Sequence, residues 1–167
     1  MDFSIREPTV SDAASMARVH VRSWQAAYAG IVDQATLDGL DVAERTATWT
    51  ARLSVPGDGP RLVAEVDREI VGFLVGVRRS PDTADAAEVL AIYLDPGAWR
   101  RGVGSALLDA GVDRLRVEET APIVLWVLEG NERARRFYEA RGWRLDGGRR
   151  DERIGDERLS DLRYRLD

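Results

Sequence analysis

Residue types that often carry chemistry are missing or nearly missing from this chain. Its 167 residues include no cysteine and a single histidine, His20, and all 24 basic residues are arginine. The lack of cysteine excludes a disulfide framework, a thiolate nucleophile and a cysteine-based metal site. One histidine is too few to build a metal site by itself, and the lack of lysine excludes a phosphate-binding P-loop. We therefore expect no bound metal.

Long hydrophobic runs are missing as well. The longest, at residues 70–77, is far shorter than the roughly 20 residues that cross a bilayer. The first residues lack a basic stretch followed by an apolar one, so no signal peptide is visible. The net charge of −5 opposes general nucleic-acid binding and is compatible with a cationic substrate such as an amine. We expect a cytoplasmic protein without membrane or nucleic-acid partners.

The composition is that of a globular protein. With 44% apolar and 32% charged residues, the chain is not disordered, and its length fits a single domain over residues 1–167. Residue periodicity and turn signals predict helices packed on a mixed sheet, an α+β or three-layer α/β domain. The predicted elements are a strand at 3–7, helices at 11–28, 34–40 and 42–53, a hairpin at 61–66 and 70–77, a strand at 89–94, a helix at 102–119, a strand at 123–128, a helix at 131–141, and two strands near 143–145 and 158–166 around a polar turn at 147–156.

The segment at residues 88–108 joins a buried strand to an apolar helix through a turn rich in arginine and glycine. Gly102 and Gly104 let the backbone approach a ligand, and the start of the helix offers free N–H groups that suit a phosphate. The alternative is a strand-to-helix turn that merely needs glycine. A dinucleotide-binding fingerprint fits worse, because its third glycine would fall on Leu107.

A second strand, turn and helix follow at residues 124–143. Asn131 precedes an acidic first turn and is a good N-cap, while Gly142 is a natural helix end. Taken alone, capping explains Asn131 as well as ligand binding does. Tyr138 is equally compatible with an aromatic at the edge of the core. A nucleotide-bearing cofactor held between the two units is the first hypothesis.

Together the two segments resemble the GNAT superfamily of acyl-CoA-dependent N-acyltransferases. Residues 89–108 are similar to the family's acyl-CoA-binding motif. The similarity is continuous from about residue 88 to 143, and residues 23–31 are less specifically similar to a bacterial branch of the family. The motif that follows is matched by Asn131-x-x-Ala134-x-x-Phe137-Tyr138-x-x-x-Gly142-Trp143.

The resemblance implies an α/β (α+β) fold. Its mixed, mainly antiparallel sheet has six to seven strands, is flanked by about four to five helices and is splayed between the fourth and fifth strands. The chain departs from the family at Trp99, where Arg or Gln is usual, so Arg100, Arg101 or the backbone must hold the pyrophosphate. The implied acetyl-CoA-binding residues are Ile92, Tyr93, Leu94, Trp99, Arg100, Arg101, Gly102, Val103, Gly104, Ser105, Asn131, Ala134 and Phe137.

The implied reaction is direct attack of an amine on the thioester of acetyl-CoA in a ternary complex. An alkylamine of pKa about 10.4 is protonated at pH 7, so freeing its lone pair costs about 4–5 kcal/mol. Glu88 is the first candidate for the base, with Glu129 in reserve, although an exposed acid at a strand end explains Glu88 equally well. Tyr138 matches the tyrosine that gives a proton to the leaving thiolate.

The acceptor is expected to be a small-molecule or peptide amine, and the sequence does not identify it. Trp24, Tyr28 and Trp49 are candidates to line its pocket, although each is also explained by core packing. Rival functions are a catalytically inactive acyl-CoA-binding regulatory module, a toxin that acetylates aminoacyl-tRNA, which the acidic balance disfavours, and transfer of a bulkier acyl group. The resemblance is compatible with a homodimer.

Overall fold

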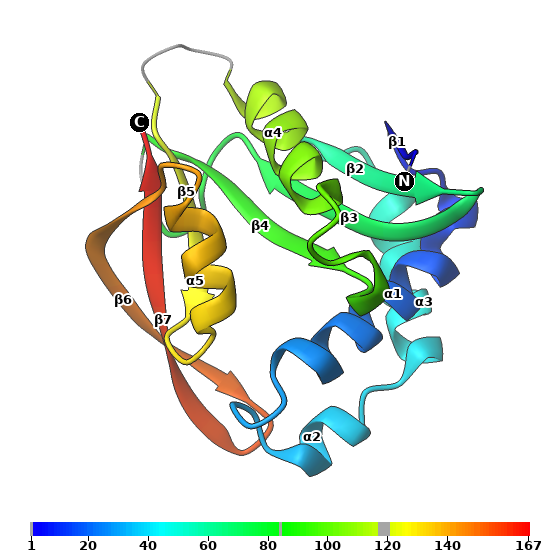
Figure 1. The fold of residues 1–167 in the computed structure, drawn as a ribbon, viewed down its shortest axis with the longest axis horizontal. Coiled ribbons are helices and arrows are strands. Elements are labelled where there is room, and N and C mark those ends of the chain that lie inside the picture. Colours follow the sequence, from blue (N-terminus) through cyan, green and yellow to red (C-terminus); the bar gives the residue numbers. More distant parts are fainter. Residues whose placement is uncertain (1, 84, 117–120) are drawn as a thin grey trace.

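The computed structural model describes residues 2–83, 85–116 and 121–167. These form a seven-stranded sheet of order β1-β2-β3-β4-β5-β7-β6 (Figure 1). Its neighbouring strands pair antiparallel except for β4 and β5, which are parallel. The mixed, mainly antiparallel sheet implied by the resemblance is confirmed. The strands are β1 (Ser4–Arg6), β2 (Arg61–Val66), β3 (Glu69–Val77), β4 (Ala87–Leu94), β5 (Ile123–Leu128), β6 (Arg144–Ile154) and β7 (Glu157–Leu166).

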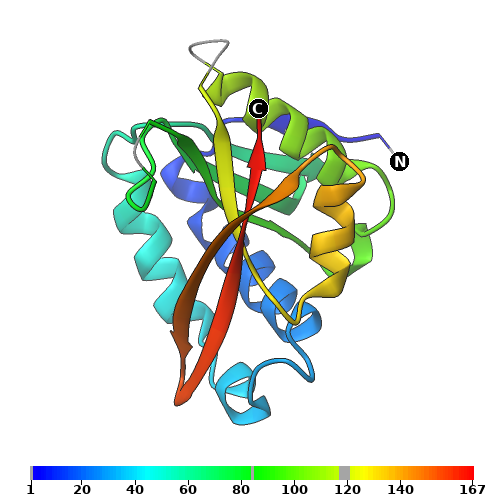
Figure 2. The ribbon, with the colours of Figure 1, turned by 90° about the vertical axis from the view of Figure 1, so that its left-hand side faces the viewer.

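Helices cover both faces of this sheet. Helices α4 and α5 lie on one face, and α1 and α3 lie on the other, while α2 lies near the tip of the β6–β7 hairpin (Figure 1, Figure 2). No helix among the described residues combines the length and apolar character needed to cross a membrane. The helices are α1 (Ala13–Ala27), α2 (Gln34–Asp38), α3 (Val42–Leu53), α4 (Val103–Leu115) and α5 (Glu132–Glu139), with short 3₁₀ turns η1 (Val10–Asp12) and η2 (Pro96–Ala98).

Strands β4 and β5 separate soon after they pair. Their register joins only residues 87–89 to residues 123–125. On its other side β4 stays paired with β3 as far as Leu94, with a bulge that leaves Leu90 unmatched. The edge of β4 that faces β5 therefore carries backbone groups without strand partners between Leu90 and Leu94. The splay implied between the fourth and fifth strands is confirmed.

The C-terminal hairpin differs from the prediction. β6 runs through most of the segment predicted as a polar turn, and the turn itself is confined to Gly155 and Asp156. β6 is an edge strand with β7 as its single strand neighbour, and most of its side chains are exposed. Such a strand does not need the alternation of apolar residues by which strands are recognised. The helix predicted at 102–119 ends at Leu115, and residues 117–120 lie outside the described residues.

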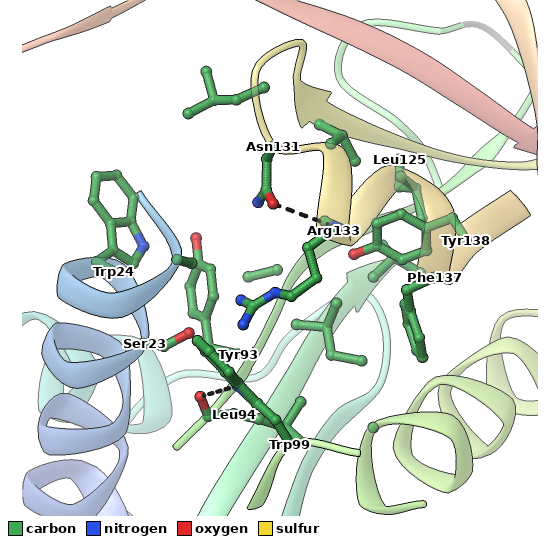
Figure 3. A pocket seen from close by; sticks show the side chains of 18 of the residues that line it. Ser23, Trp24, Tyr93, Leu94, Trp99, Leu125, Asn131, Arg133, Phe137 and Tyr138 are labelled. Carbon is green, nitrogen blue, oxygen red and sulfur yellow. Dashed lines mark hydrogen bonds between the residues drawn. The ribbon is translucent and has the colours of Figure 1, made fainter. Parts of the chain in front are cut away.

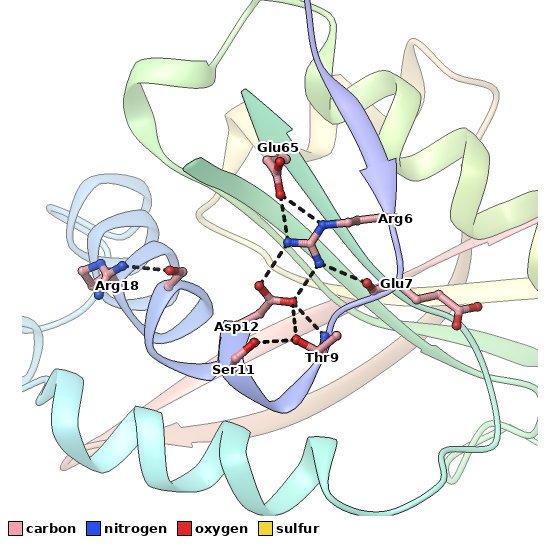
Figure 4. Close-up of polar contacts among 8 residues, drawn as sticks. Arg6, Glu7, Thr9, Ser11, Asp12, Arg18 and Glu65 are labelled. Carbon is pink, nitrogen blue, oxygen red and sulfur yellow. Dashed lines mark hydrogen bonds and ion pairs between the residues drawn. The ribbon is translucent and has the colours of Figure 1, made fainter. Parts of the chain in front are cut away.

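An ion-pair cluster fastens the N-terminal strand to the start of α1 (Figure 4). The Arg6 guanidinium donates to both carboxylate oxygens of Asp12, at 2.8 and 3.0 Å, and to Glu65 of β2 at 2.8 Å. Asp12 also accepts a hydrogen bond from the Thr9 backbone N–H at 2.7 Å. The Arg6 bond is the main reason why the pKa of Asp12 is lowered to about 2.

Candidate active site

A cavity of about 320 Å³ opens where β4 and β5 part (Figure 3). Both strands, the end of α1, the turn that leads into α4 and the first turns of α5 contribute to its wall. Its lining residues are Ser23, Trp24, Ala27 and Tyr28, then Val89, Leu90, Ala91, Ile92, Tyr93, Leu94, Trp99, Arg100, Gly102, Gly104 and Ser105, then Leu125, Trp126, Val127, Leu128, Asn131, Arg133, Ala134, Phe137 and Tyr138.

The cavity passes through the sheet, because side chains that point to opposite faces line it. Ile92 and Leu125 belong to the core cluster of α4 and α5, whereas Tyr93 packs with the cluster of α1 and α3. Along β5, Trp126 alternates with core residues and therefore faces the α1 side. We call the part lined by Ser23, Trp24, Ala27, Tyr28, Tyr93, Trp126 and Leu128 the α1 half, and the part lined by Ile92, Leu94, Gly102, Gly104, Arg133, Ala134, Phe137 and Tyr138 the α4–α5 half.

The turn into α4 presents backbone donors to this second half. Gly102 is the N-cap, with φ of +84° and no side-chain cap, so the N–H groups of the first helical turn keep no intrahelical partner. Arg100 also has a positive φ, 58°, which is unusual for a residue with a side chain. A Cβ at Gly104 would lie 3.5 Å from Leu94 and 3.8 Å from Phe137. These features fit a diphosphate held at the helix start.

Two side chains stack beside this turn. The guanidinium carbon of Arg133 lies 3.3 Å from the centroid of the Trp99 ring, and the Trp99 indole N–H donates to the Leu94 carbonyl at 3.1 Å (Figure 3). Burial and, secondarily, the charge of Arg100 lower the pKa of Arg133. No ion pair reaches Arg133 from the residues that the structure describes. Arg133 is exposed, so its positive charge is available to an anionic ligand at this turn.

Asn131 and Tyr138 lie at opposite ends of α5. The Asn131 side chain accepts from the Ala134 N–H at 3.2 Å, so its capping role is present, and the residue also lines the cavity. Tyr138 is buried, and its hydroxyl points into the cavity (Figure 3). Burial, with a smaller effect of Tyr93, raises the pKa of Tyr138. Tyr138 therefore carries its proton throughout the neutral range.

Glu88 is placed differently from the other candidates. It is buried with 3% of its surface exposed, but it does not line the cavity. Its carboxylate accepts a hydrogen bond from the Ser80 hydroxyl at 2.6 Å. Burial raises the pKa of Glu88, while Ser80 and Arg150 act in the opposite direction. The reserve candidate, Glu129, is half-exposed and paired with Arg149 at 2.6 Å.

The aromatic candidates on the N-terminal helices divide into two groups. Trp24 and Tyr28 line the α1 half, with ring centroids 4.9 Å apart. Trp49 lies in the core, and its indole N–H donates to Nδ1 of His20 at 3.4 Å. Burial lowers the pKa of His20 to about 4, so this histidine is a neutral packing residue at pH 7. The described residues hold no group of acidic or histidine side chains arranged for a metal ion.

Most of the residues named from the sequence thus meet in one cavity. Besides Glu88, Glu129 and Trp49, two residues of the turn are exceptions. The Val103 side chain is fully buried in the core, and Arg101 is exposed, so neither side chain lines the cavity. Sequence reasoning did not single out Arg133, Ser23 or Trp126. Only the position of Arg133, two residues after a predicted N-cap, could have drawn attention to it.

Comparison with known proteins agrees with this geometry. Residues 21–143 match the model of the acetyltransferase (GNAT) family. The uncharacterized N-acetyltransferase YuaI of Bacillus subtilis is 32% identical over 139 residues, which cover 82% of this chain and 78% of that protein. Among solved structures, the PaiA N-acetyltransferase of Thermoplasma acidophilum in complex with coenzyme A superposes with a TM-score of 0.73 at 22% identity, covering 98% of this chain and 100% of that one.

A second structural neighbour was solved with acetyl-CoA. The putative acetyltransferase YncA of Salmonella typhimurium has a TM-score of 0.71 at 19% identity, and the match covers 99% of this chain and 94% of that one. Fold and cavity therefore agree with the family whose model the sequence matches. The chain belongs to the acetyltransferase (GNAT) family. The resemblance seen in the sequence is confirmed.

Proposed function

We propose that this protein, as a single domain over residues 1–167, transfers an acetyl group from acetyl-CoA to a primary amine by direct attack in a ternary complex. One observation carries the proposal: the cavity passes through the sheet at the splay, with the Tyr138 hydroxyl facing its interior. Acetyl-CoA can then present its thioester carbonyl from one face of the sheet, while the amine approaches this carbonyl from the other face. Such positioning converts a bimolecular reaction into an effectively unimolecular one.

The donor binds in the α4–α5 half. The N–H groups at the start of α4 and the guanidinium of Arg133 bind the diphosphate, and Arg100 adds positive charge. The unpaired edge of β4 over residues 92–94 binds the pantetheine arm through its backbone groups. The same edge offers N–H donors that stabilise negative charge on the carbonyl oxygen as the amine attacks.

Two side chains move protons in this proposal. Tyr138 donates its proton to the departing thiolate, which is itself poorly stabilised in a buried site. Glu88 is the base, and since its carboxylate does not line the cavity, it acts through intervening water. Burial favours this role, because it raises the pKa of Glu88 toward that of an effective base at neutral pH. Trp24 and Tyr28 line the acceptor site.

The test is an acetyl-CoA consumption assay that follows thiol release against a panel of amines. The protein should release thiol only when an amine is present. Tyr138→Phe should lower kcat by roughly 10²–10⁴-fold while the Kd of CoA, measured by calorimetry, stays within about twofold. Binding of CoA without amine-dependent thiol release from any amine would overturn the proposal and leave an inactive CoA-binding module.

A further inference from the structure

The α1 half of the cavity differs from the α4–α5 half in its charge. Both charged side chains that line the cavity, Arg100 and Arg133, belong with the turn into α4 and with the start of α5. Among the described residues that line the α1 half, none is acidic or basic. An acceptor bound there meets aromatic faces, Leu128 and the hydroxyls of Ser23, Tyr28 and Tyr93.

The rings of this half stand nearly at right angles to one another. Trp24 meets Tyr28 with centroids 4.9 Å apart at 86°, and meets Tyr93 at 6.3 Å and 72°. Such walls suit an apolar or aromatic body, and their faces attract one ammonium group by cation–π contact. Burial raises the pKa of Tyr28 far above its usual value, so its hydroxyl stays neutral and available to a ligand.

Two carboxylates raise the pKa of Tyr28 through their charge, and each has a protein partner. The charges of Asp161 and Glu152 raise the pKa of the Tyr28 hydroxyl, and both carboxylates pair with Arg150, at 3.1 and 3.9 Å. Glu88 accepts from Ser80. None of these carboxylates lines the cavity, so none places an oxygen against a second ammonium group inside it.

We infer that the acceptor is a monoamine with an apolar or aromatic body, and that amines with a second cationic group near the first are rejected. This inference rests on the proposed function. A second ammonium would be desolvated in the α1 half without a counterion, which is unfavourable, whereas a hydrocarbon group in its place would be buried favourably. The aromatic walls, by contrast, gain from contact with an apolar chain or ring.

The test compares amines that differ in one group. Butylamine and 1,4-diaminobutane share the same chain length, and 2-phenylethylamine adds an aromatic body. We expect kcat/KM, counted per amino group, to be at least tenfold higher for butylamine and for 2-phenylethylamine than for the diamine. Any lower ratio overturns the inference, while thiol release from the diamine would still uphold acetyl transfer itself. If no amine led to thiol release although the protein still bound CoA, the result would instead contradict the proposed function.

A matched pair of variants tests the cause. Ala27 lines the α1 half and is only partly buried, so Ala27→Glu places a carboxylate there and Ala27→Gln is its neutral control. The diamine-to-butylamine ratio of kcat/KM should rise at least tenfold in Ala27→Glu relative to Ala27→Gln, with an unchanged Kd for CoA in both. An equal ratio in the two variants would show that charge in this half does not select the acceptor.

Discussion

The guanidinium of Arg133 lies over the indole of Trp99 at 3.3 Å, and this pair joins the turn into α4 to the first turn of α5. Trp99 occupies the position at which the family usually has a basic or amide side chain. Arg133 brings a positive charge to the same place from the other unit of the cavity. The stacked Trp99 ring orients the guanidinium of Arg133. The ring is itself fixed, because the Trp99 indole N–H donates to the Leu94 carbonyl.

Arg133→Ala should therefore weaken CoA binding about ten- to hundredfold, since a charge-assisted hydrogen bond contributes roughly 1.5–3 kcal/mol. Pantetheine lacks the diphosphate, so its Kd should change by less than about twofold. Arg133→Lys should retain part of the CoA affinity, because a point charge replaces the planar guanidinium. Calorimetry with both ligands measures these effects.

The control for this prediction lies on the same helix. Arg136 is exposed, paired with Glu132 and absent from the lining of the cavity, so Arg136→Ala should leave both dissociation constants unchanged. Equal weakening of CoA and pantetheine by Arg133→Ala would mean that the side chain supports the shape of the site and does not bind the diphosphate.

The proposed base can be tested by its pH dependence. Glu88 acts as a base only when deprotonated, so kcat should fall as the pH drops through its pKa, which burial raises above the ordinary value of 4.5. Glu88→Gln should lower kcat by about 10²-fold or more and remove this acidic limb. Glu129→Gln, at the end of the neighbouring strand, is the control, and its profile should match that of the unchanged protein. If kcat of Glu88→Gln still fell at low pH as in the unchanged protein, a group other than Glu88 would be the titrating base.

The sequence predicted this candidate site because its motifs are local. Each motif joins a strand to a helix within about 20 residues, so the resemblance to the family names the glycines, Asn131 and Tyr138, which spacing alone left ambiguous. The contact of Arg133 with Trp99 is not local, since it depends on how two such units face each other across the splay. The position of Glu88 shows the same limit: its strand was predicted, but its bond to Ser80 depends on how the preceding loop folds back.

The fold was predicted best where apolar residues repeat. The buried strands β2, β3, β4 and β5 carry continuous apolar runs and were all expected. β6 was missed over most of its length because its polar side chains are held by ion pairs to β7, such as Arg163 with Asp146 at 2.8 Å and Arg150 with Asp161. Pairing between distant charges leaves no periodic pattern in the sequence.

The cluster at Arg6 predicts how stability depends on pH. Folding lowers the pKa of Asp12 from 3.8 to about 2, so its ion pair stabilises the native state above pH 4 and is lost as the pH falls through about 2. Asp12→Asn should lower the free energy of unfolding by about 2 kcal/mol at pH 7, and this difference should shrink between pH 4 and pH 2. Urea unfolding at several pH values measures it, with Asp113→Asn, on the exposed face of α4, as a control expected to change little. A difference that stays constant down to pH 2 would contradict the linkage.

Two glycines of α4 separate packing from ligand binding. A Cβ at Gly111 would lie 2.6 Å from Cδ1 of Leu74, which is fully buried, whereas a Cβ at Gly104 would meet Leu94 at an ordinary 3.5 Å and project toward the cavity. Gly111→Ala should therefore destabilise the protein by about 1–3 kcal/mol through overpacking and leave the Kd of CoA nearly unchanged. Gly104→Ala should keep or raise stability, because alanine favours the helix by up to about 1 kcal/mol, and should weaken CoA roughly tenfold. Thermal unfolding and calorimetry on both variants give the two readouts. Because the same methyl group is added to the same helix, a loss of CoA affinity in Gly111→Ala but not in Gly104→Ala would place the donor elsewhere than at the start of α4.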